Sequence, residues 1–313
     1  MISSSPLVDW LLEGLELDAS LFHVGRYCGG WHASTQGLAR ASFHLIVQGH
    51  CWLHIDGAPQ ALRLDAGDAV FLLQDLGYRL SSAQQAEAAQ QLPRTPMVPL
   101  EPGAQDGVGL VCGFFHFKPG LSSLIIDSLP GWLILRAGDP SLSAARALFQ
   151  LILEECQRTP APSSALLERL SHLLFLYVLR QQVNANQDLG GLVALARHPG
   201  FAPLLEQLIQ RPGEAWPLES MAALTGLSRS AFFKRFNELA GQSPGQVLLA
   251  LRMRHACQLL KANQTVEQVG AAVGYQSIAA FTRAFTKAVG LQPGAYRCLL
   301  YTSDAADEED SVD

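Results

Sequence analysis

One segment near the carboxyl end of the chain occurs twice, and this repeat limits the possible folds more than any other feature. Residues 218–224 match residues 266–272 at an offset of 48. After one inserted residue, six further positions recur at an offset of 49. In the first copy they are Ser228, Phe232, Phe236, Gly241, Pro244 and Gly245, and their counterparts are Ser277, Phe281, Phe285, Gly290, Pro293 and Gly294. A repeat of this period indicates two copies of one supersecondary unit.

Each copy is typical of a short helix, a turn that contains glycine, and a second helix that begins after a capping serine. The paired phenylalanines of each second helix are four residues apart, so we expect them to anchor that helix in a core. Small residues at 222–223 and 270–272 allow the two helices of each copy to approach closely. This is the outline of a helix-turn-helix, whose second helix enters the major groove of DNA.

The opposite face of each second helix is available to a partner. It carries Arg229, Ser230, Phe233 and Lys234 in the first copy, and Ile278, Ala279, Thr282 and Arg283 in the second. Between the copies, residues 244–261 can form a helix of about 27 Å, and recognition helices in successive grooves lie about 34 Å apart. An ordinary helical bundle is the alternative, but turn glycines, serine caps and basic faces coincide in both copies.

The charge of the chain is unevenly distributed. The net charge of −6 argues against nucleic acid as a partner. Residues 201–300, however, contain ten Lys and Arg against five Asp and Glu, whereas the last thirteen residues contain six acids and no base. With 313 residues, of which 49% are apolar, the chain suits two domains with connecting helices.

The amino-terminal half has a different pattern. Short runs rich in branched and aromatic residues predict strands at 43–47, 51–56, 69–73 and 109–117, with a long loop over 81–109. Such strands favour a sandwich or small barrel. Residues 141–157 and 163–183 then show helical periodicity and are separated by two prolines. These amphipathic helices are either a dimerisation element or packed only on their own domain.

Residues 203–297 resemble the AraC/XylS-type DNA-binding domain over its whole length. The resemblance rests on Gly241-Gln-Ser-Pro-Gly, Leu251-Arg-Met-Arg-His-Ala, and the closing run from Val273 to Arg297. It implies double-stranded promoter DNA as a partner, together with a homodimer partner and RNA polymerase. It also assigns base-edge contacts to Ser230, Phe233 and Lys234, and in the second copy to Ile278, Ala279, Thr282 and Arg283. The side chains of Phe233, Ile278 and Ala279 cannot form hydrogen bonds with bases, but apolar side chains of this kind contact thymine methyl groups.

Residues 20–120 resemble the cupin-type sensor domain of a branch of AraC-type regulators. The matching segments are Phe43-His-Leu-Ile-Val-Gln-Gly, Cys51-Trp-Leu-His-Ile-Asp-Gly and Leu64-Asp-Ala-Gly-Asp-Ala-Val-Phe. The expected architecture is therefore α+β and multidomain. A cupin-like β-barrel over 1–136 precedes central helices over 137–199, and an all-α domain with two helix-turn-helix motifs spans 200–297.

The signal for such a domain has several candidates. His44, Cys112 and His116 offer soft nitrogen and sulfur ligands for zinc, although a packed histidine with a satisfied hydrogen bond is the simpler explanation of His44. Cys28 and Cys112 are candidate redox-sensing thiols, which would require an accessible thiolate of low pKa. A plain small-molecule effector in the barrel needs neither a metal nor a thiol. No metal or other cofactor is required by this interpretation.

The function indicated is a sequence-specific transcription regulator that couples a sensed signal to DNA binding. The alternative is a cupin-type metal-dependent enzyme with an accessory helical domain. Against it, His32 stands alone where many cupins have two histidines, and Tyr78 replaces a later one. No catalytic residues are assigned. A third class is an architectural protein that binds DNA without sequence preference.

The ends of the chain and its cysteines bear on location. No apolar run reaches the roughly 18 residues that span a bilayer, and no secretory signal is visible. The six cysteines are dispersed, which is typical of a reducing compartment, so we expect a cytoplasmic protein. Residues 298–313 resemble a translated sequencing-adapter read-through and are expected to be non-native. The alternative is a genuine acidic tail.

Overall fold

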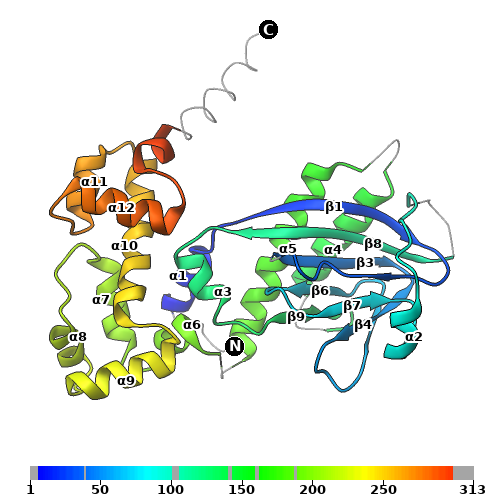
Figure 1. Cartoon of the computed structure of the whole chain (residues 1–313), viewed down its shortest axis with the longest axis horizontal. Helices are drawn as coiled ribbons and strands as arrows, with labels where there is room; N and C mark the ends of the chain where they lie inside the picture. Colours follow the sequence, from blue (N-terminus) through cyan, green and yellow to red (C-terminus); the bar gives the residue numbers. More distant parts are fainter. Residues whose placement is uncertain are drawn as a thin grey trace, which may run out of the picture. The chain divides into compact units, whose positions relative to one another are not determined.

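Two antiparallel sheets form the amino-terminal half of the chain in the computed structural model (Figure 1). The structure describes residues 6–38, 40–100, 106–139, 143–158, 162–186 and 189–298. The larger sheet has the order β1 (Leu17–Tyr27), β8 (Val108–Phe117), β3 (Ala41–Gln48), β6 (Ala69–Leu72) and β9 (Trp132–Leu135). The smaller sheet has the order β2 (His32–Ala33), β7 (Tyr78–Ser81), β4 (His50–Ile55) and β5 (Leu62–Asp65). The expectation of a small sandwich or barrel is confirmed.

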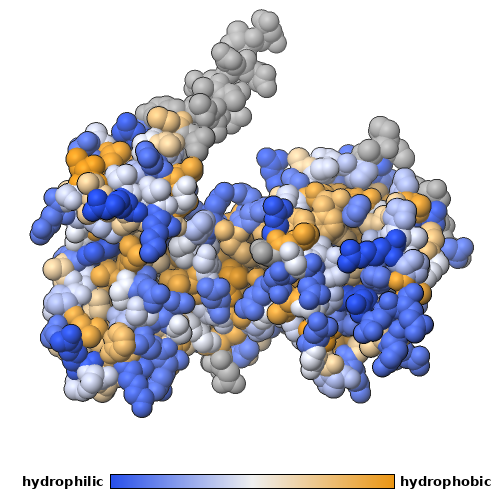
Figure 2. Space-filling model, viewed as in Figure 1, coloured by the Kyte–Doolittle hydropathy of each residue, from blue (hydrophilic) through white to orange (hydrophobic). Residues whose placement is uncertain are grey.

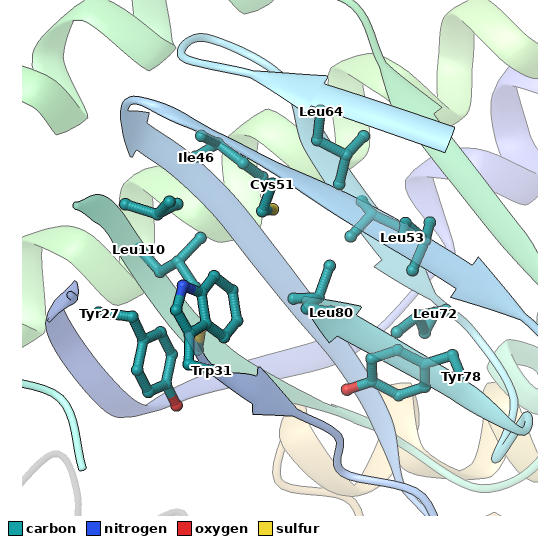
Figure 3. Packing of buried hydrophobic residues seen from close by; sticks show 13 residues of the cluster. Tyr27, Trp31, Ile46, Cys51, Leu53, Leu64, Leu72, Tyr78, Leu80 and Leu110 are labelled. Carbon is teal, nitrogen blue, oxygen red and sulfur yellow. The ribbon is translucent and has the colours of Figure 1, made fainter. Parts of the chain in front are cut away.

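The core of this half lies between the two sheets. Inward-facing residues of both sheets form one buried cluster, in which Ile46 and Leu110 come from the larger sheet and Leu53 and Leu80 from the smaller (Figure 3). Trp31 is 1% exposed and stacks on Tyr27 with ring centroids 4.2 Å apart. Because alternate residues of a strand face opposite sides, one face of each strand supplies this cluster.

The outer face of the larger sheet is also covered, which explains why β3 is buried on both sides. The helices α4 (Ser143–Cys156) and α5 (Ser164–Ala185) follow the sheets in the chain. Phe175 of α5 packs on Phe115 and Phe71 of the sheet, with ring centroids 4.7 and 5.5 Å apart. Ser163 caps α5 by accepting a hydrogen bond from the backbone N–H of Leu166.

Local details of this half differ from the sequence-based expectation. The segment expected to be a loop over 81–109 contains the short helix α2 (Ala86–Gln91), whose Ala89 is fully buried. The strand β9 was not expected, although it pairs with β6 in register from Leu135 opposite Ala69 to Trp132 opposite Leu72. Both segments are short, so their periodicity is too weak to be recognised in the sequence.

The remaining described helices form a second unit. They are α1 (Pro6–Glu13), α3 (Leu121–Ile126), α6 (Gly191–Arg197), α7 (Ala202–Gln210), α8 (Leu218–Leu224), α9 (Arg229–Ala240), α10 (Pro244–Lys261), α11 (Val266–Ala272) and α12 (Ile278–Val289). Of the described residues, 6–16, 117–128 and 189–298 thus group as one helical unit, while those of 17–116 and 129–186 form the sheet unit.

Two separate phenylalanine clusters organise the helical unit. In the first, Phe232 and Phe236 of α9 pack with Phe201, and all three are at most 2% exposed. In the second, Phe281 and Phe285 of α12 are fully buried with aliphatic residues of α10 and α11. The paired phenylalanines thus anchor both helices as the repeat predicts.

The ends of the repeated helices also correspond. The helices α9 and α12 each have twelve residues and begin 49 positions apart. Both end at a glycine in the left-handed conformation, Gly241 with φ of 66° and Gly290 with φ of 84°, a region in which side chains other than glycine are strained. The predicted connecting helix over 244–261 is α10, with the same bounds.

Two further expectations concern membrane-spanning segments and the end of the chain. In the part of the chain that the structure describes, no helix is both long and apolar enough to cross a membrane. The expected non-native tail, apart from Cys298, lies outside the described residues.

Candidate nucleic-acid interface and sensor cavity

The second helices of the two repeats present equivalent exposed faces. The hydroxyl of Ser228 accepts a hydrogen bond from the Ala231 N–H at 3.4 Å, and that of Ser277 from the Ala280 N–H at 3.2 Å. These caps fix where each helix begins, and therefore which side chains point away from the phenylalanine clusters. The faces predicted for DNA contact are exposed or half-buried at every position: Arg229, Ser230, Phe233, Lys234, Ile278, Ala279, Thr282 and Arg283.

Two of these positions expose large apolar side chains. Phe233 is 43% exposed and Ile278 is 48% exposed. Contact with a thymine methyl group suits both side chains. Arg229 already has a partner, since its Nη1 lies 2.8 Å from the Glu219 carboxylate of α8. Both members of this ion pair are solvent-exposed, so solvent screens it and a phosphate can compete for the guanidinium.

Other basic residues of the helical unit have structural partners. Arg252 donates from Nε to the Pro212 carbonyl at 2.7 Å and from Nη2 to the Glu214 carbonyl at 2.8 Å. Burial lowers the pKa of Arg252. Lys261 forms an ion pair with Glu16 at 3.2 Å. Part of the positive charge of residues 201–300 therefore holds the unit together rather than facing a partner.

Sequence reasoning missed one polar residue of the first face. Asn237 lies four positions after Phe233 and three after Lys234, so it shares their face of α9, and it is half-buried. Asparagine pairs with adenine through two hydrogen bonds in the major groove. The spacing of residues along the helix places Asn237 on this face, whereas the family resemblance assigns contacts only to the first turns of the helix.

The sheet unit contains a cavity of about 350 Å³. Its walls are mostly apolar and aromatic, and Phe22 and Phe114 at its edge have ring centroids 4.6 Å apart. Phe22 is 36% exposed on β1, and Figure 2 shows hydrophobic residues gathered at the surface over the region of this strand. Small-molecule sites have this volume and this character. The lining also includes His44, Cys112 and Thr35.

A chain of hydrogen bonds crosses the floor of this cavity. His44 pairs through Nδ1 with Cys112 Sγ at 3.1 Å and through Nε2 with the Tyr78 hydroxyl at 2.7 Å. Thr35 donates its N–H to the Tyr78 oxygen at 3.0 Å, and its hydroxyl lies 2.7 Å from the same oxygen and donates to Ser42 at 3.1 Å. With that hydroxyl proton on Ser42, Tyr78 donates to Thr35, His44 Nε2–H donates to Tyr78, and the Cys112 thiol donates to His44 Nδ1.

Burial maintains the neutral forms that this chain of bonds requires. Burial lowers the pKa of His44 to about 3 and raises the pKa of the Cys112 thiol because the charged form of each group loses its hydration. The pKa of Tyr78 is also raised, mainly by burial. The floor of the cavity is therefore polar but uncharged at neutral pH.

The predicted zinc ligands are not brought together. His44 and Cys112 are in contact, but His116 is exposed and its Nε2 pairs with the Ser20 hydroxyl at 2.9 Å. Among the described residues, no three histidine, cysteine or carboxylate side chains form a group that could hold a metal ion. Both ring nitrogens of His44 already have partners, which matches the simpler interpretation of a packed histidine.

The two candidate thiols lie in opposite environments. Cys112 is 4% exposed and its pKa is raised, so it lacks the access and the thiolate character that a redox sensor needs. Cys28 is exposed. Of these two thiols, Cys28 is therefore the accessible one.

Comparison with known proteins supports the division into two functional parts. A family described as cupin matches residues 7–184, and one described as a helix-turn-helix domain matches residues 221–298. A transcriptional regulator of the helix-turn-helix type from Haemophilus influenzae is 30% identical over 277 residues, which cover 86% of this chain and 90% of that protein. An AraC-like transcription regulator from Streptomyces antibioticus is 28% identical, with 90% and 93% covered.

Among solved structures, ToxT from Vibrio cholerae aligns over 92% of this chain and 98% of its own, with 10% identity and a TM-score of 0.37. The Haemophilus influenzae and Streptomyces antibioticus relatives are both transcription regulators and match this chain over most of their length. The amino-terminal half of the chain matches the cupin family, and the carboxyl-terminal half matches the helix-turn-helix family. The chain therefore belongs to the AraC-type family of DNA-binding transcription regulators that carry an amino-terminal cupin domain.

Proposed function

We propose that this regulator reads two neighbouring major-groove segments through α9 and α12, and that a small molecule in the sheet-unit cavity alters this binding. The observation that carries the proposal is the equivalence of the two helices. They begin at equivalent serines, end at left-handed glycines 49 residues apart, and expose the same face. A single rigid helix of 18 residues, α10, connects the two motifs and suits the spacing of successive grooves.

The two helices would read DNA differently. The first combines Lys234, Ser230 and Asn237 with Phe233, so it supplies both hydrogen bonds and an apolar contact. The second offers Arg283 and Thr282 beside Ile278 and Ala279, so it depends more on apolar contact and on phosphate. We expect the half-site of the first helix to be the more sharply defined.

Selection from a random duplex library with the purified full chain tests sequence-specific binding. The expected result is one enriched motif with two parts, whose affinity falls steeply with salt because basic residues displace counterions. Variants Lys234→Ala and Arg283→Ala should each relax one part of the motif. Recovery of no motif, with equal affinity for all fragments, would mean an architectural protein instead.

The signal is assigned to the cavity because of its lining. The uncharged polar floor and the aromatic walls suit an organic molecule with an apolar body, and Arg94 in the lining adds one cationic group, whereas the buried, protonated Cys112 does not suit thiol chemistry. The test is a thermal-shift screen of small organic compounds, repeated on Leu38→Trp, which narrows the cavity at a residue that is 54% exposed. The matched control is Leu151→Trp on α4, at a residue that is 49% exposed and does not line the cavity. Hits that bind both variants equally would exclude this site.

Self-association is assigned to α5. Leu166, Leu173 and Tyr177 are 45–47% exposed and recur at helical spacing on one face. A second copy of the chain would cover this face and pair two regulators on promoter DNA, where RNA polymerase is the expected further partner. Because the target is the promoter, the proposed location is the cytoplasm. Regulation, rather than the metal-dependent catalysis of other cupins, is proposed as the activity, and iron-dependent turnover by the purified chain would contradict it.

A further inference from the structure

The two helix-turn-helix motifs touch at a second place besides α10, within the helical unit. The loop of residues 211–217, which connects α7 to α8, lies against the turn between α11 and α12 (Figure 1). A Cβ atom on Gly213 would fall on the carbonyl oxygen of Ala272, and a Cβ atom on Gly274 would fall on the carbonyl oxygen of Gly213. The backbones of the two segments are therefore in direct contact, and neither glycine has room for a side chain.

This contact belongs to the pair of motifs and not to the helix-turn-helix itself. The turn glycine of the second motif, Gly274, has a φ of 84°, and its counterpart in the first motif, Gly226, has a φ of 68°. Among the described residues, however, nothing lies within 4 Å of a Cβ atom built on Gly226. The φ of Gly213 lies outside the left-handed region, so only the neighbouring segment requires glycine there.

Arg252 holds the loop in this position. It belongs to α10, and its Nε and Nη2 donate to the carbonyl groups of Pro212 and Glu214, the residues on either side of Gly213. The same Nη2 would lie 3.1 Å from a Cβ atom on Gly274. The planar guanidinium presents its donors in a fixed fork, so two bonds from one side chain set both the position and the direction of the loop.

The loop is also bonded internally. The carbonyl of Arg211 accepts hydrogen bonds from the Glu214 N–H at 3.2 Å and from Trp216 Nε1 at 2.9 Å. The helix that carries Arg252 is in turn part of the second phenylalanine cluster, through three residues of its carboxyl-terminal half: Met253, Ala256 and Leu260. The bonds of Arg252 therefore join the entry of the first motif to the core of the second.

A second connection changes what the pair of motifs can do. Two bodies joined only by a helix can change their relative angle at the ends of that helix, whereas a further contact beside it removes this freedom. Each added base pair moves the next half-site by about 3.4 Å and rotates it by about 34–36°. A fixed pair of recognition helices therefore fits one spacing of half-sites and is misaligned at the neighbouring spacings.

We propose that Arg252 and the contact between Gly213 and Gly274 form a brace that fixes the separation and rotation between α9 and α12. The brace makes the regulator selective for the number of base pairs between its two half-sites. Arg252 is thus a positioning residue, which acts on DNA recognition through the loop and not by contact with bases. The inference rests on the proposed function, since it requires that α9 and α12 each read one part of the motif.

The test uses the two-part motif selected by the native full chain, in duplexes with one base pair added or removed between the parts. Fluorescence anisotropy measures the affinity for each duplex. The native protein should lose affinity at least about tenfold at either altered spacing. Arg252→Gln should reduce this loss to less than about threefold. A single base substitution within either part should cost the native protein and the variant the same factor, because the recognition faces are unchanged.

Matched variants separate the brace from charge and from folding. Arg252→Lys should give an intermediate spacing profile, because an ammonium group can donate to a carbonyl but lacks the fork. Arg235→Gln removes the same charge from an exposed side chain and should keep the native profile. Gly213→Ala pushes the loop away from Ala272 without a change of charge and should flatten or displace the profile. Its control is Gly245→Ala, where the added methyl group meets open space among the described residues.

The outcomes distinguish this inference from the proposed function. Circular dichroism identifies the variants that fold, and Gly213→Ala decides the question if Arg252→Gln does not fold. A two-part motif with a native spacing profile in the folded brace variants overturns the brace and leaves the proposed function intact. Equal native affinity at all spacings does the same. A selected motif with only one part contradicts the proposed function and the brace together.

Discussion

The imidazole of His44 is hydrogen-bonded to the thiol of Cys112, with Nδ1 3.1 Å from Sγ, on the floor of the sensor cavity. The two residues face each other on adjacent strands, β3 and β8, at paired positions of the larger sheet. Although the two residues are 68 positions apart in the chain, the register of the two strands places them side by side. Two groups that singly suggest a metal ligand and a redox thiol stabilise each other as a neutral pair.

This burial makes the stability of the protein depend on pH. The pKa of His44 is lowered to about 3 from an ordinary value of 6.5. Between these values the unfolded chain binds a proton that the folded chain does not, so the free energy of unfolding falls as pH falls. The titration of His44 should leave the free energy of unfolding unchanged above about pH 6.5. At pH 4.5 it should lower the free energy of unfolding by about 2–3 kcal/mol, since each pKa unit corresponds to about 1.36 kcal/mol.

Chemical denaturation at pH 7.5 and 4.5, followed by circular dichroism, measures this dependence. His44→Gln should lose less stability than the native protein over this interval. His50→Gln, at an exposed position of β4, should retain the native dependence. If His44→Gln loses as much stability as the native protein, His44 does not titrate as described.

The reactivity of the cysteines should follow their exposure. Cys28 is exposed, whereas Cys112 is buried and its pKa is raised. Mild treatment with iodoacetamide or hydrogen peroxide should modify Cys28 and leave Cys112 unmodified until the protein unfolds, because the thiolate is the reactive species. Peptide mass spectrometry of native and urea-treated protein measures both sites. Early modification of Cys112 would contradict its assignment as an inaccessible thiol.

The glycine that ends α9 should resist substitution. Gly241 has a φ of 66°, so Gly241→Ala should destabilise the protein by about 1–2 kcal/mol. Gly245, four residues further on in α10, has no atom within 4 Å of its would-be Cβ. Gly245→Ala should therefore be neutral or stabilise by up to about 1 kcal/mol. Thermal unfolding of the two variants compares them directly, and equal effects would contradict the assigned conformations.

DNA recognition should depend on the side chains of the predicted DNA-contact face of α9 rather than on the total charge of this helix. Lys234→Ala should weaken binding to the selected site by about 1–3 kcal/mol, the usual contribution of a good base contact. Arg235→Ala removes the same charge from a side chain that is paired with Glu238 at 3.3 Å, and it should weaken binding less. Gel-shift titration measures both, and a greater loss in Arg235→Ala would reverse the assigned orientation.

Self-association should require the exposed face of α5. The double variant Leu166→Glu and Leu173→Glu places two charges on this face, and a like-charged surface cannot pair with a second copy of itself. Sedimentation velocity should show a dimer for the native protein and a monomer for the variant. Glu substitution of the exposed Leu227, in the helical unit, is the control. A native monomer, or a dimer that survives both charges, would exclude this interface.

The boundaries of the repeated motifs were predictable from the sequence because they depend on local signals. Serine caps, left-handed glycines and phenylalanines four residues apart act within one or two turns, so α9, α10 and α12 lie where the repeat places them. The helices α4 and α5 were predictable for the same reason. The strand β9 was not, because its pairing partner β6 lies about 60 residues earlier in the chain.

The amino-acid sequence by itself determined the duplicated helix-turn-helix, the family and the excess of basic residues in the carboxyl-terminal region. Only the tertiary structure decided which of those residues are available. Arg252 holds carbonyl groups, Arg254 stacks on Trp10, and Lys234 remains at the surface. Strand register likewise turned His44 and Cys112 into a neutral pair and left His116 outside it. Local periodicity is encoded in neighbouring residues, whereas the partner of a charge or a thiol depends on contacts between distant segments, which no local pattern records.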